Sequence, residues 1–304
     1  MSNVVKVRVP GTTANCGSGF DTLGIACTIY NEFTLSLTGQ DDLTVEVTGE
    51  GRDIIPADER NIAVKAVRAV LDRVGWPGRG MHIAMTNAIP LARGLGSSAA
   101  AIVAGLVAAN AATGNTLSPK DILAMATAFE GHPDNVAPAL TGGVTVSFLQ
   151  DGQPHSLRFV PPSALSLVVA VPAFTLATEL ARQALPQTVP FSDAVFNVSR
   201  AALLSVALCQ GEFGLLRYAL EDRLHQPYRE KLVPGMPEVF AAAMNNGALG
   251  VALSGAGPCL MAFADRNEAA IGEAMVQAFK DIGVTAAYLS LNIDTEGTKV
   301  LSTA

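Results

Sequence analysis

Pro90-Leu-Ala-Arg-Gly-Leu-Gly-Ser-Ser-Ala-Ala100 is the stretch around which this chain is organised. Gly94 and Gly96 flank a leucine, and glycine permits a positive φ and a close approach of the backbone to a ligand. Ser97 and Ser98 follow, and a serine at a helix start can satisfy free N–H groups. An Ala-, Val- and Leu-rich segment of strong helix propensity then runs to residue 110. Because N–H groups at a helix start favour an anion, the stretch predicts a phosphate-binding loop.

Two common phosphate loops are excluded, and one structural alternative stays open. The loop is not of the Walker type, because no Gly-Lys-Ser/Thr follows the glycines. It is not the Gly-x-Gly-x-x-Gly dinucleotide loop either, because Ala99 stands at the third glycine. The residues alone also fit a tight turn into a close-packed core helix that binds nothing.

The composition indicates a folded, acidic protein. With 304 residues, 49% hydrophobic and 15% charged, the chain is expected to form one large or two moderate domains and not a disordered segment. A net charge of −7 without a Lys/Arg cluster disfavours nucleic-acid binding. The apolar stretches 99–112 and 165–177 are too short or too interrupted to span a membrane, and the alternating N-terminus does not resemble a signal peptide. Four cysteines without a Cys-x-x-Cys pair indicate reduced thiols and a cytoplasmic protein.

Hydrophobic periodicity predicts alternating strands and helices. A helix over 118–130 has Ser118 as cap and Pro119 at its first position, and 131–133 stops it. A polar turn at 150–154 is the expected boundary between residues 1–153 and 154–304. Strands are expected at 5–9 (ending at Pro10-Gly11), 28–37, 43–47, 81–85, 145–148, 167–171, 250–253, 260–264 and 286–291, and further helices at 61–74, from 177, at 237–245 and at 267–282.

Four other segments carry residue types suited to chemistry. The glycine-rich loop 12–24 contains Asn15 and Asp21, which its composition also explains as turn residues. Residues 130–135 gather two carboxylates, an imidazole and a carboxamide. The residues alone favour a helix end followed by a polar turn, and one histidine is poor evidence for zinc. Thr178 and Arg182 stand four apart, on one helical face. Pro-Tyr-Arg229 and the glycine-rich turn 253–259 follow later in the chain.

Together these segments resemble the GHMP kinases. The stretch 90–100 is similar to the second motif of that superfamily, and 253–259 is similar to the third. Residues 14–21 resemble the first motif in its homoserine kinase form, with Cys16 and Ser18 in place of leucine and proline. Glu130-Gly-His-Pro-Asp-Asn-Val-Ala-Pro138, followed by Gly142-Gly143, resembles a signature of the homoserine kinase branch in its compact form.

The resemblance implies an α+β fold of two domains. Residues 1–153 would form an N-terminal nucleotide-binding domain like domain 2 of ribosomal protein S5, and 154–304 a ferredoxin-like C-terminal domain, with the site in the cleft between them. The implied activity is phosphorylation of the side-chain hydroxyl of L-homoserine by ATP and Mg²⁺, which gives O-phospho-L-homoserine on the route to threonine. The implied partners are these small molecules, without nucleic acid or membrane, and a homodimer is a candidate assembly.

The resemblance also implies roles for individual residues. Ser98 and Glu130 would hold Mg²⁺, a hard ion that takes oxygen ligands. The nucleotide-binding residues would be Pro90, Arg93, Gly94, Leu95, Gly96, Ser97, Ser98, Ala99, Ala100 and, from its sequence context, Asn61. The substrate-binding residues would be Asn15, Asp21, His132, Asp134, Asn135, Thr178, Arg182, Arg229 and Gly255. Two arginines suit an α-carboxylate, because a guanidinium binds it bidentately.

Glu130, Asp134 and Asn135 are the candidate catalytic residues. Asn135 stands where mevalonate-type relatives have an aspartate, and a carboxamide cannot act as a base, so Asn135 is expected to orient the hydroxyl. The proton would leave to the phosphate oxygens or to water, and Asp134 as general base is the competing hypothesis.

Three alternative functions remain at this point. The first is a GHMP kinase for another small alcohol, such as mevalonate, shikimate or pantoate. The second is a GHMP-fold regulator that binds a nucleotide or metabolite without catalysis, although Ser98 and Glu130 are intact. The third, which the residues alone support, is an acidic α+β protein that binds some phosphate compound.

Overall fold

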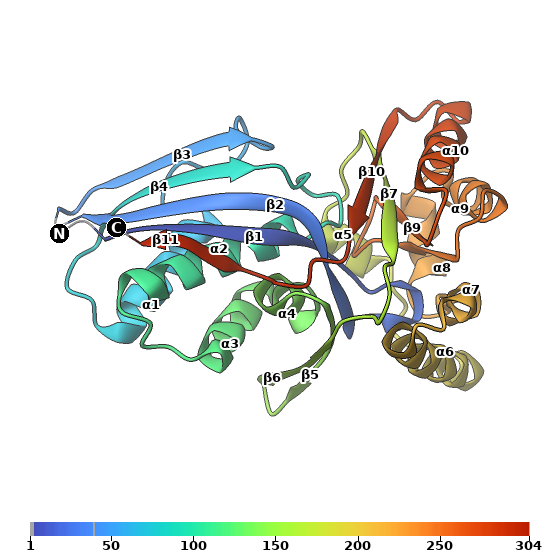
Figure 1. Cartoon of the computed structure of the whole chain (residues 1–304), viewed down its shortest axis with the longest axis horizontal. Helices are drawn as coiled ribbons and strands as arrows, with labels where there is room; N and C mark the ends of the chain where they lie inside the picture. The colour runs from blue at the N-terminus through green and yellow to red at the C-terminus, as the bar shows by residue number, and fades with distance from the viewer. Residues whose placement is uncertain (1–2, 39, 304) are drawn as a thin grey trace.

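The computed structural model describes residues 3–38 and 40–303 and contains two β-sheets side by side (Figure 1). The first sheet has seven strands in the order β11-β1-β2-β4-β3, with β5 pairing β2 and β6 pairing β5. The long strand β2 bends between the two parts of this sheet, pairing β4 through residues 32–38 and β5 through 23–25. The strands are β1 (Asn3–Ala14), β2 (Leu23–Thr38), β3 (Leu43–Gly49), β4 (Gly80–Asn87), β5 (Val144–Gln150), β6 (Gln153–Phe159) and β11 (Lys299–Thr303).

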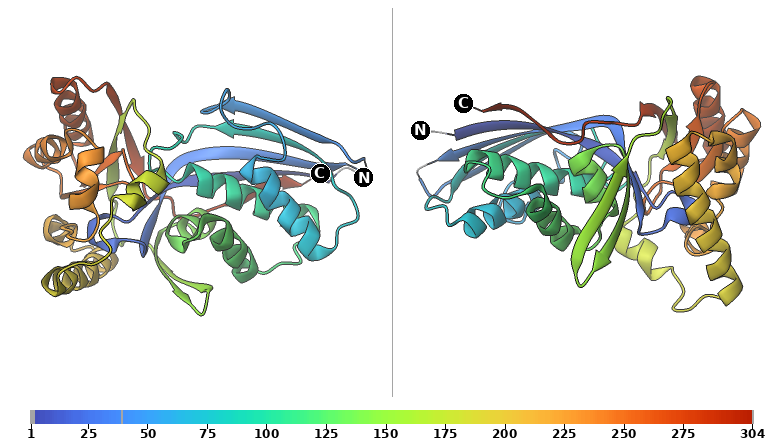
Figure 2. Two further views of the ribbon diagram at one scale, coloured as in Figure 1. Left: turned by 180° about the vertical axis from the view of Figure 1, so that it is seen from behind. Right: turned by 60° about the horizontal axis from the view of Figure 1, so that its bottom comes forward.

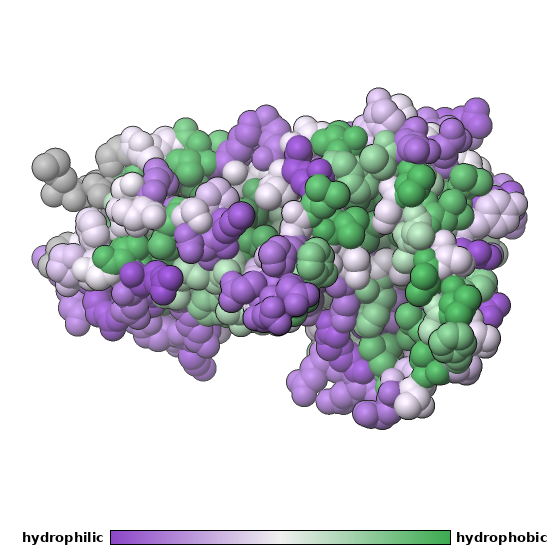
Figure 3. Space-filling view, turned by 90° about the horizontal axis from the view of Figure 1, so that it is seen from below, coloured by the Kyte–Doolittle hydropathy of each residue, from purple (hydrophilic) through white to green (hydrophobic). Residues whose placement is uncertain are grey.

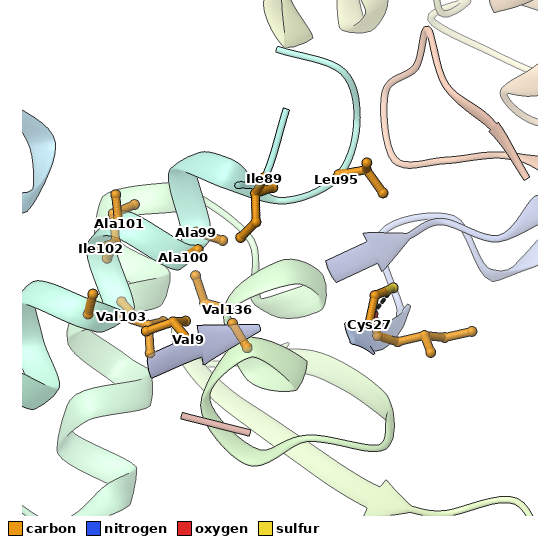
Figure 4. Close-up of a cluster of buried hydrophobic side chains, with 14 of the residues drawn as sticks. Val9, Cys27, Ile89, Leu95, Ala99, Ala100, Ala101, Ile102, Val103 and Val136 are labelled. Carbon is orange, nitrogen blue, oxygen red and sulfur yellow. Dashed lines mark hydrogen bonds between the residues drawn. The ribbon is translucent and has the colours of Figure 1, made fainter. Parts of the chain in front are cut away.

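The helices of the first domain lie on one side of the first sheet (Figure 2). They are α1 (Ile62–Val74), α2 (Ser97–Ala112), α3 (Pro119–Glu130) and α4 (Pro133–Thr141). Thirteen of the sixteen residues of α2 are buried, so this helix is apolar all round and forms the centre of the layer. In Figure 4, Ala99, Ala100 and Val103 of α2 lie beside Val9 of β1 and Val136 of α4.

The second sheet has four strands in the order β10-β7-β9-β8. With β7, β8, β9 and β10 as first to fourth strand, this order and the two helical crossovers define the ferredoxin-like arrangement. The strands are β7 (Ser166–Pro172), β8 (Gly250–Leu253), β9 (Leu260–Ala264) and β10 (Ala286–Asn292). The helices are α5 (Thr178–Gln183), α6 (Phe191–Gln210), α7 (Leu216–Ala219), α8 (Gln226–Arg229), α9 (Met236–Asn245) and α10 (Glu268–Asp281).

The side chains of β7 alternate between two hydrophobic cores. Leu167 and Val169 belong to the large core that continues under the first sheet. Val168 and Ala170 belong to a smaller core beneath α9 and α10, which also contains Phe279. The two domains therefore share a continuous core. The α+β two-domain fold expected from the sequence is confirmed.

The structure corrects three local expectations. Strand β1 does not end at Pro10-Gly11 but continues to Ala14, with a shift of register at that dipeptide that lets the strand bend. No serine caps α2, because Gly96 is the N-cap residue and Ser97 is already helical. The segment after Glu130 is not an extended polar turn, because α4 begins at Pro133 with His132 as its N-cap residue.

The expected domain boundary at residue 153 falls inside the first sheet. Strand β6 begins there and pairs along its whole length with β5, so the two form a hairpin within the first sheet. The division between the sheets lies after Phe159, and β11 later returns to the first sheet beside β1. The other expected strands and helices are present, with ends that differ by a few residues.

The twenty-residue helix α6 was not expected from the sequence. Within the described part of the chain it is the one helix long and apolar enough to cross a membrane by length and composition, and 22% of its apolar window is buried. Leu204 and Leu208 on its inner face belong to the large core, and Asn197 donates a hydrogen bond to Asp222. We therefore interpret α6 as an outer helix of the second domain.

Candidate active site

The glycine loop before α2 is held in a conformation that only glycine adopts easily. Gly94 and Gly96 have φ values of +80° and +69°. A Cβ at Gly94 would lie 2.0 Å from the carbonyl oxygen of Ser254, and one at Gly96 would lie 2.0 Å from Thr12 Oγ1. The N–H groups of the first turn of a helix have no partner within the helix, and no side chain caps those of α2. This uncapped helix start fits a phosphate group.

A cavity opens at this loop and is lined by both domains. Among the residues assigned to the site from the sequence, those that line it are Asn15, Arg93, Gly94, Leu95, Gly96, Ser97, Ser98, Glu130, His132, Asn135, Thr178, Arg182, Arg229 and Gly255. Asp21 lines the hollow next to it, together with Glu130 and Arg182. The segments that the sequence analysis singled out therefore converge on one place.

Four of the expected nucleotide-binding residues do not line this cavity. Ala99 and Ala100 are buried in the core around α2 (Figure 4). Pro90 precedes the loop. Asn61 caps α1 by accepting a hydrogen bond from the N–H of Ala63, and it donates another to the Pro56 carbonyl. A nucleotide contact by these four residues stays a prediction.

Ser98 and Glu130, the expected metal ligands, lie together at the cavity. Ser98 Oγ donates a hydrogen bond of 3.2 Å to Glu130 Oε2, from the start of α2 to the end of α3. Burial raises the pKa of Glu130, and nearby His132 and Ser98 oppose part of this shift. The described residues contain no group of three or more His, Cys, Asp or Glu side chains that could hold a metal. Two oxygen ligands fit Mg²⁺, which commonly completes its shell with phosphate oxygens and water.

The opposite side of the cavity carries two arginines. Arg182 on α5 donates to both oxygens of Asp21, with distances of 2.8 and 3.1 Å. The Asp21 carboxylate raises the pKa of Arg182, so this guanidinium stays charged. Arg229 on α8 is only 1% exposed, and burial together with the charge of Arg182 lowers its pKa to about 10. It too is protonated at neutral pH.

His132, Asp134 and Asn135 differ in what they face. Asn135 lines the cavity, and its Oδ1 accepts a hydrogen bond of 2.9 Å from Thr12, which leaves the amide N–H groups for a ligand. Asp134 is 1% exposed and does not line the cavity. It pairs with His132 Nδ1 and thereby orients a ring that does line it. Thr12 is a contact that the sequence analysis missed, because a threonine at a strand end carries no signal of its own.

Asn15 and Arg93 connect parts of the site to one another. Asn15 Nδ2 donates to the Gly255 carbonyl at 2.7 Å, and its Oδ1 accepts from the N–H of Asp21. The Arg93 guanidinium donates to the carbonyls of Pro172 and Ala173 in the second domain. These contacts give both side chains a structural role at the junction of the domains.

Comparison with known proteins agrees with this geometry. Residues 61–143 match the GHMP kinases N-terminal domain, and residues 204–289 match the GHMP kinases C-terminal domain. The fold, the glycine loop and these matches define the class of protein as a two-domain GHMP kinase.

Full-length relatives narrow the class. The chain is 48% identical to the homoserine kinase of Moorella thermoacetica, over 91% of this chain and 93% of the relative, and 45% identical to that of Carboxydothermus hydrogenoformans, over 97% and 96%. The crystal structure of homoserine kinase from Cytophaga hutchinsonii matches with a TM-score of 0.90 and 32% identity, over 98% of this chain and 97% of that one. The chain belongs to the homoserine kinase family, which confirms the resemblance noted in the sequence.

The pairing of His132 with Asp134 predicts a measurable pKa difference. Burial lowers the pKa of His132, but the hydrogen bond and charge of Asp134 outweigh it, so the net pKa lies above the ordinary 6.5. In Asp134→Asn the charge is gone and burial remains, so His132 should titrate at a lower pH than in the parent protein. A ¹H–¹⁵N NMR titration measures this, and the other three histidines serve as internal controls. An unchanged His132 titration would contradict the pairing.

Proposed function

We propose that the cavity transfers the γ-phosphoryl group of ATP to the side-chain hydroxyl of L-homoserine, with Mg²⁺ bound by Ser98 and Glu130. The observation that supports this best is the meeting of three features in one cavity: an uncapped helix start, a pair of oxygen ligands, and charged groups of both signs. Phosphoryl transfer depends on positioning and charge neutralisation more than on covalent help, and these features supply both.

The glycine loop would hold the phosphates through backbone N–H groups at the start of α2. Such donors need no lysine, which agrees with a phosphate site in a chain of net charge −7. When bound, Mg²⁺ neutralises charge on the transferring group. The side-chain oxygens of Ser98 and Glu130 lie next to each other beside this loop, where they would bind the ion.

Homoserine is a zwitterion, and the far side of the cavity has charges that suit both of its ends. Arg229 and Arg182, with Thr178 beside them, would hold the carboxylate. Asp21 is the carboxylate next to the arginines and would meet the ammonium group. The burial of Arg229 strengthens its interaction with an anion, because the surrounding dielectric is low.

Asn135 would orient the substrate hydroxyl through its amide N–H groups, since its oxygen is taken by Thr12. The burial of Asp134 behind His132 supports the version in which the proton leaves to phosphate oxygens or water. A pH–rate profile whose acidic limb disappears in folded Asp134→Asn would instead assign the base to Asp134. The product would be O-phospho-L-homoserine, an intermediate on the route to threonine.

A coupled ADP-release assay with ATP and Mg²⁺ tests the proposal over L-homoserine, shikimate, mevalonate and pantoate. We expect turnover with homoserine alone. Glu130→Gln removes a metal ligand and should lower kcat by about a hundredfold, whereas Glu46→Gln, exposed on β3, should leave it unchanged. Turnover of another alcohol would contradict the assignment of Arg182, Arg229 and Thr178 to the carboxylate of homoserine. ATP binding without any turnover would favour a regulator.

A second prediction concerns the glycine loop. Gly96→Ala places a Cβ against Thr12 and should raise the KM for ATP by at least about tenfold, because the loop must shift. Gly114→Ala is the matched control, since Gly114 also has a positive φ, +93°, but no atom within 4 Å of the added Cβ. Both variants should lose some thermal stability. Equal KM values for ATP would show that the loop does not hold the nucleotide.

We also propose a cytoplasmic homodimer that forms through α6. Phe191, Val195, Val198 and Val206 are exposed along this helix, and the green surface at the right of Figure 3 covers this end of the molecule. The charged residues of α6, Asp193 and Arg200, form ion pairs within the chain. The exposed apolar residues of this helix therefore present no free charge of α6 to a second copy. Four free cysteines support a reducing compartment.

Sedimentation equilibrium tests the dimer. Val198 is 71% exposed, so Val198→Asp should leave the fold intact but weaken self-association by at least about tenfold. Ile54, 79% exposed on the first domain, provides the control Ile54→Asp, which should leave the mass unchanged. A monomeric parent protein would contradict the proposal.

A further inference from the structure

Hydrogen bonds within the protein occupy two of the three guanidinium nitrogens of Arg229 and leave the third for a ligand in the cavity. Its Nε donates to the carbonyl of Ala181 at 3.2 Å. Its Nη1 lies 3.3 Å from the carbonyl of Gly255 and 3.3 Å from Nδ1 of His225. Within the described structure these contacts account for Nε and Nη1, while Arg229 also lines the cavity. The remaining nitrogen, Nη2, is therefore the one that a ligand carboxylate can engage.

The partners of His225 determine which of its ring nitrogens carries the proton. Its Nε2 lies 2.8 Å from the carbonyl oxygen of Gly17 and 3.5 Å from Asp222 Oδ2, and both oxygens only accept. Its Nδ1 faces Arg229, which only donates. The ring must therefore carry its proton on Nε2 and accept at Nδ1. Burial and Arg229 lower the pKa of His225 to about 4, which agrees with a neutral ring.

The surroundings of His225 leave its ring little freedom. The ring is fully buried and stacks on Phe20, with centroids 4.9 Å apart and planes inclined by 20°. Asp222 Oδ2 accepts from the backbone N–H groups of His225 and Gln226, at 3.0 and 2.6 Å. The Arg229 guanidinium carbon lies 5.2 Å from the same Phe20 ring. Phe20 and Gly17 belong to the first motif, so His225 connects that loop to Arg229.

We propose that His225 is a positioning residue that acts through Arg229. It fixes the guanidinium so that Nη2 presents its donors to the substrate carboxylate, and it couples this orientation to the loop at Gly17. Among the described residues, the side-chain hydrogen bonds and ring contact of His225 go to Gly17, Arg229 and Phe20 and not to the phosphate loop or to Ser98 and Glu130. Its effect should therefore fall on the amino-acid substrate and not on ATP. The inference rests on the proposed function of Arg229.

Two substitutions of His225 test the roles of its two ring nitrogens, Nδ1 and Nε2, separately. In His225→Asn the side-chain amide lies near the position of Nδ1 and can still accept from Arg229. In His225→Gln the amide lies near Nε2, which keeps the link to Gly17 and loses the acceptor for Arg229. We expect His225→Gln to raise the KM for homoserine about tenfold, with kcat and the KM for ATP nearly unchanged, as for loss of one hydrogen bond to a charged group. His225→Asn should raise the KM for homoserine less than His225→Gln does.

A double-mutant cycle with Arg229→Gln supplies the decisive comparison. If His225 acts through Arg229, His225→Gln should have no further effect on the KM for homoserine in the Arg229→Gln background. Equal effects of both His225 variants on every kinetic constant, in proportion to lost thermal stability, would overturn the inference. So would additive effects in the cycle.

One readout does not depend on turnover. In ¹⁵N NMR spectra of the parent protein, His225 should show the neutral form with the proton on Nε2, and His225 should be the histidine whose Nδ1 signal moves in Arg229→Gln. Spectra of this kind without homoserine turnover would contradict the proposed function and leave the His225–Arg229 link intact. Turnover with a protonated Nδ1 would contradict the link alone.

Discussion

Two glycines of the loop before α2 allow this loop to contact two other segments at the centre of the structure, because glycine has no Cβ atom. Gly94 lies against Ser254, whose hydroxyl donates to the Gly94 carbonyl at 2.7 Å. Gly96 lies against Thr12, whose N–H donates to the Leu95 carbonyl at 3.0 Å. Because the backbone approaches so closely, the start of α2 is anchored on both sides without a cap. No side chain then occupies the first N–H groups of α2, an arrangement that suits an anion.

A continuous core makes this arrangement rigid. Strand β7 contributes one face to the large core and one to the smaller core, so the second sheet cannot shift without disturbing the packing under the first. Arg93 and Asn15 add polar contacts across the same junction. The site is thus built between two domains whose relative position is fixed by packing, which suits a reaction that depends on positioning.

The sequence identified the segments that meet at the cavity more completely than it predicted the secondary-structure elements between them. Glycines, serines and charged residues in fixed order identify the loops, because few other residues can perform those tasks. Helix α6 was missed because its apolar residues lie on its exposed face as well as its buried one, which blurs the helical period. Asp134 and Asn135 are neighbours that point about 100° apart on a helix, so their roles depend on where α4 begins. Thr12 was missed because its partner Asn135 is distant in sequence.

The two arginines of the site differ in how they are prepared for an anion. Arg182 is partly exposed and already paired with Asp21, so a ligand carboxylate must share or displace that carboxylate. Arg229 is buried, and the three acceptors that hydrogen-bond it are neutral. Burial lowers its pKa and the charges of Asp21, Asp222 and Asp134 oppose this shift, but none of them is a hydrogen-bond partner that the structure gives it. A bound carboxylate would add a directly hydrogen-bonded counter-ion to this buried charge, which is otherwise unfavourable. If both arginines bind the substrate as proposed, Arg229 gains more from its carboxylate than Arg182 does, and the neutral ring of His225 preserves that difference.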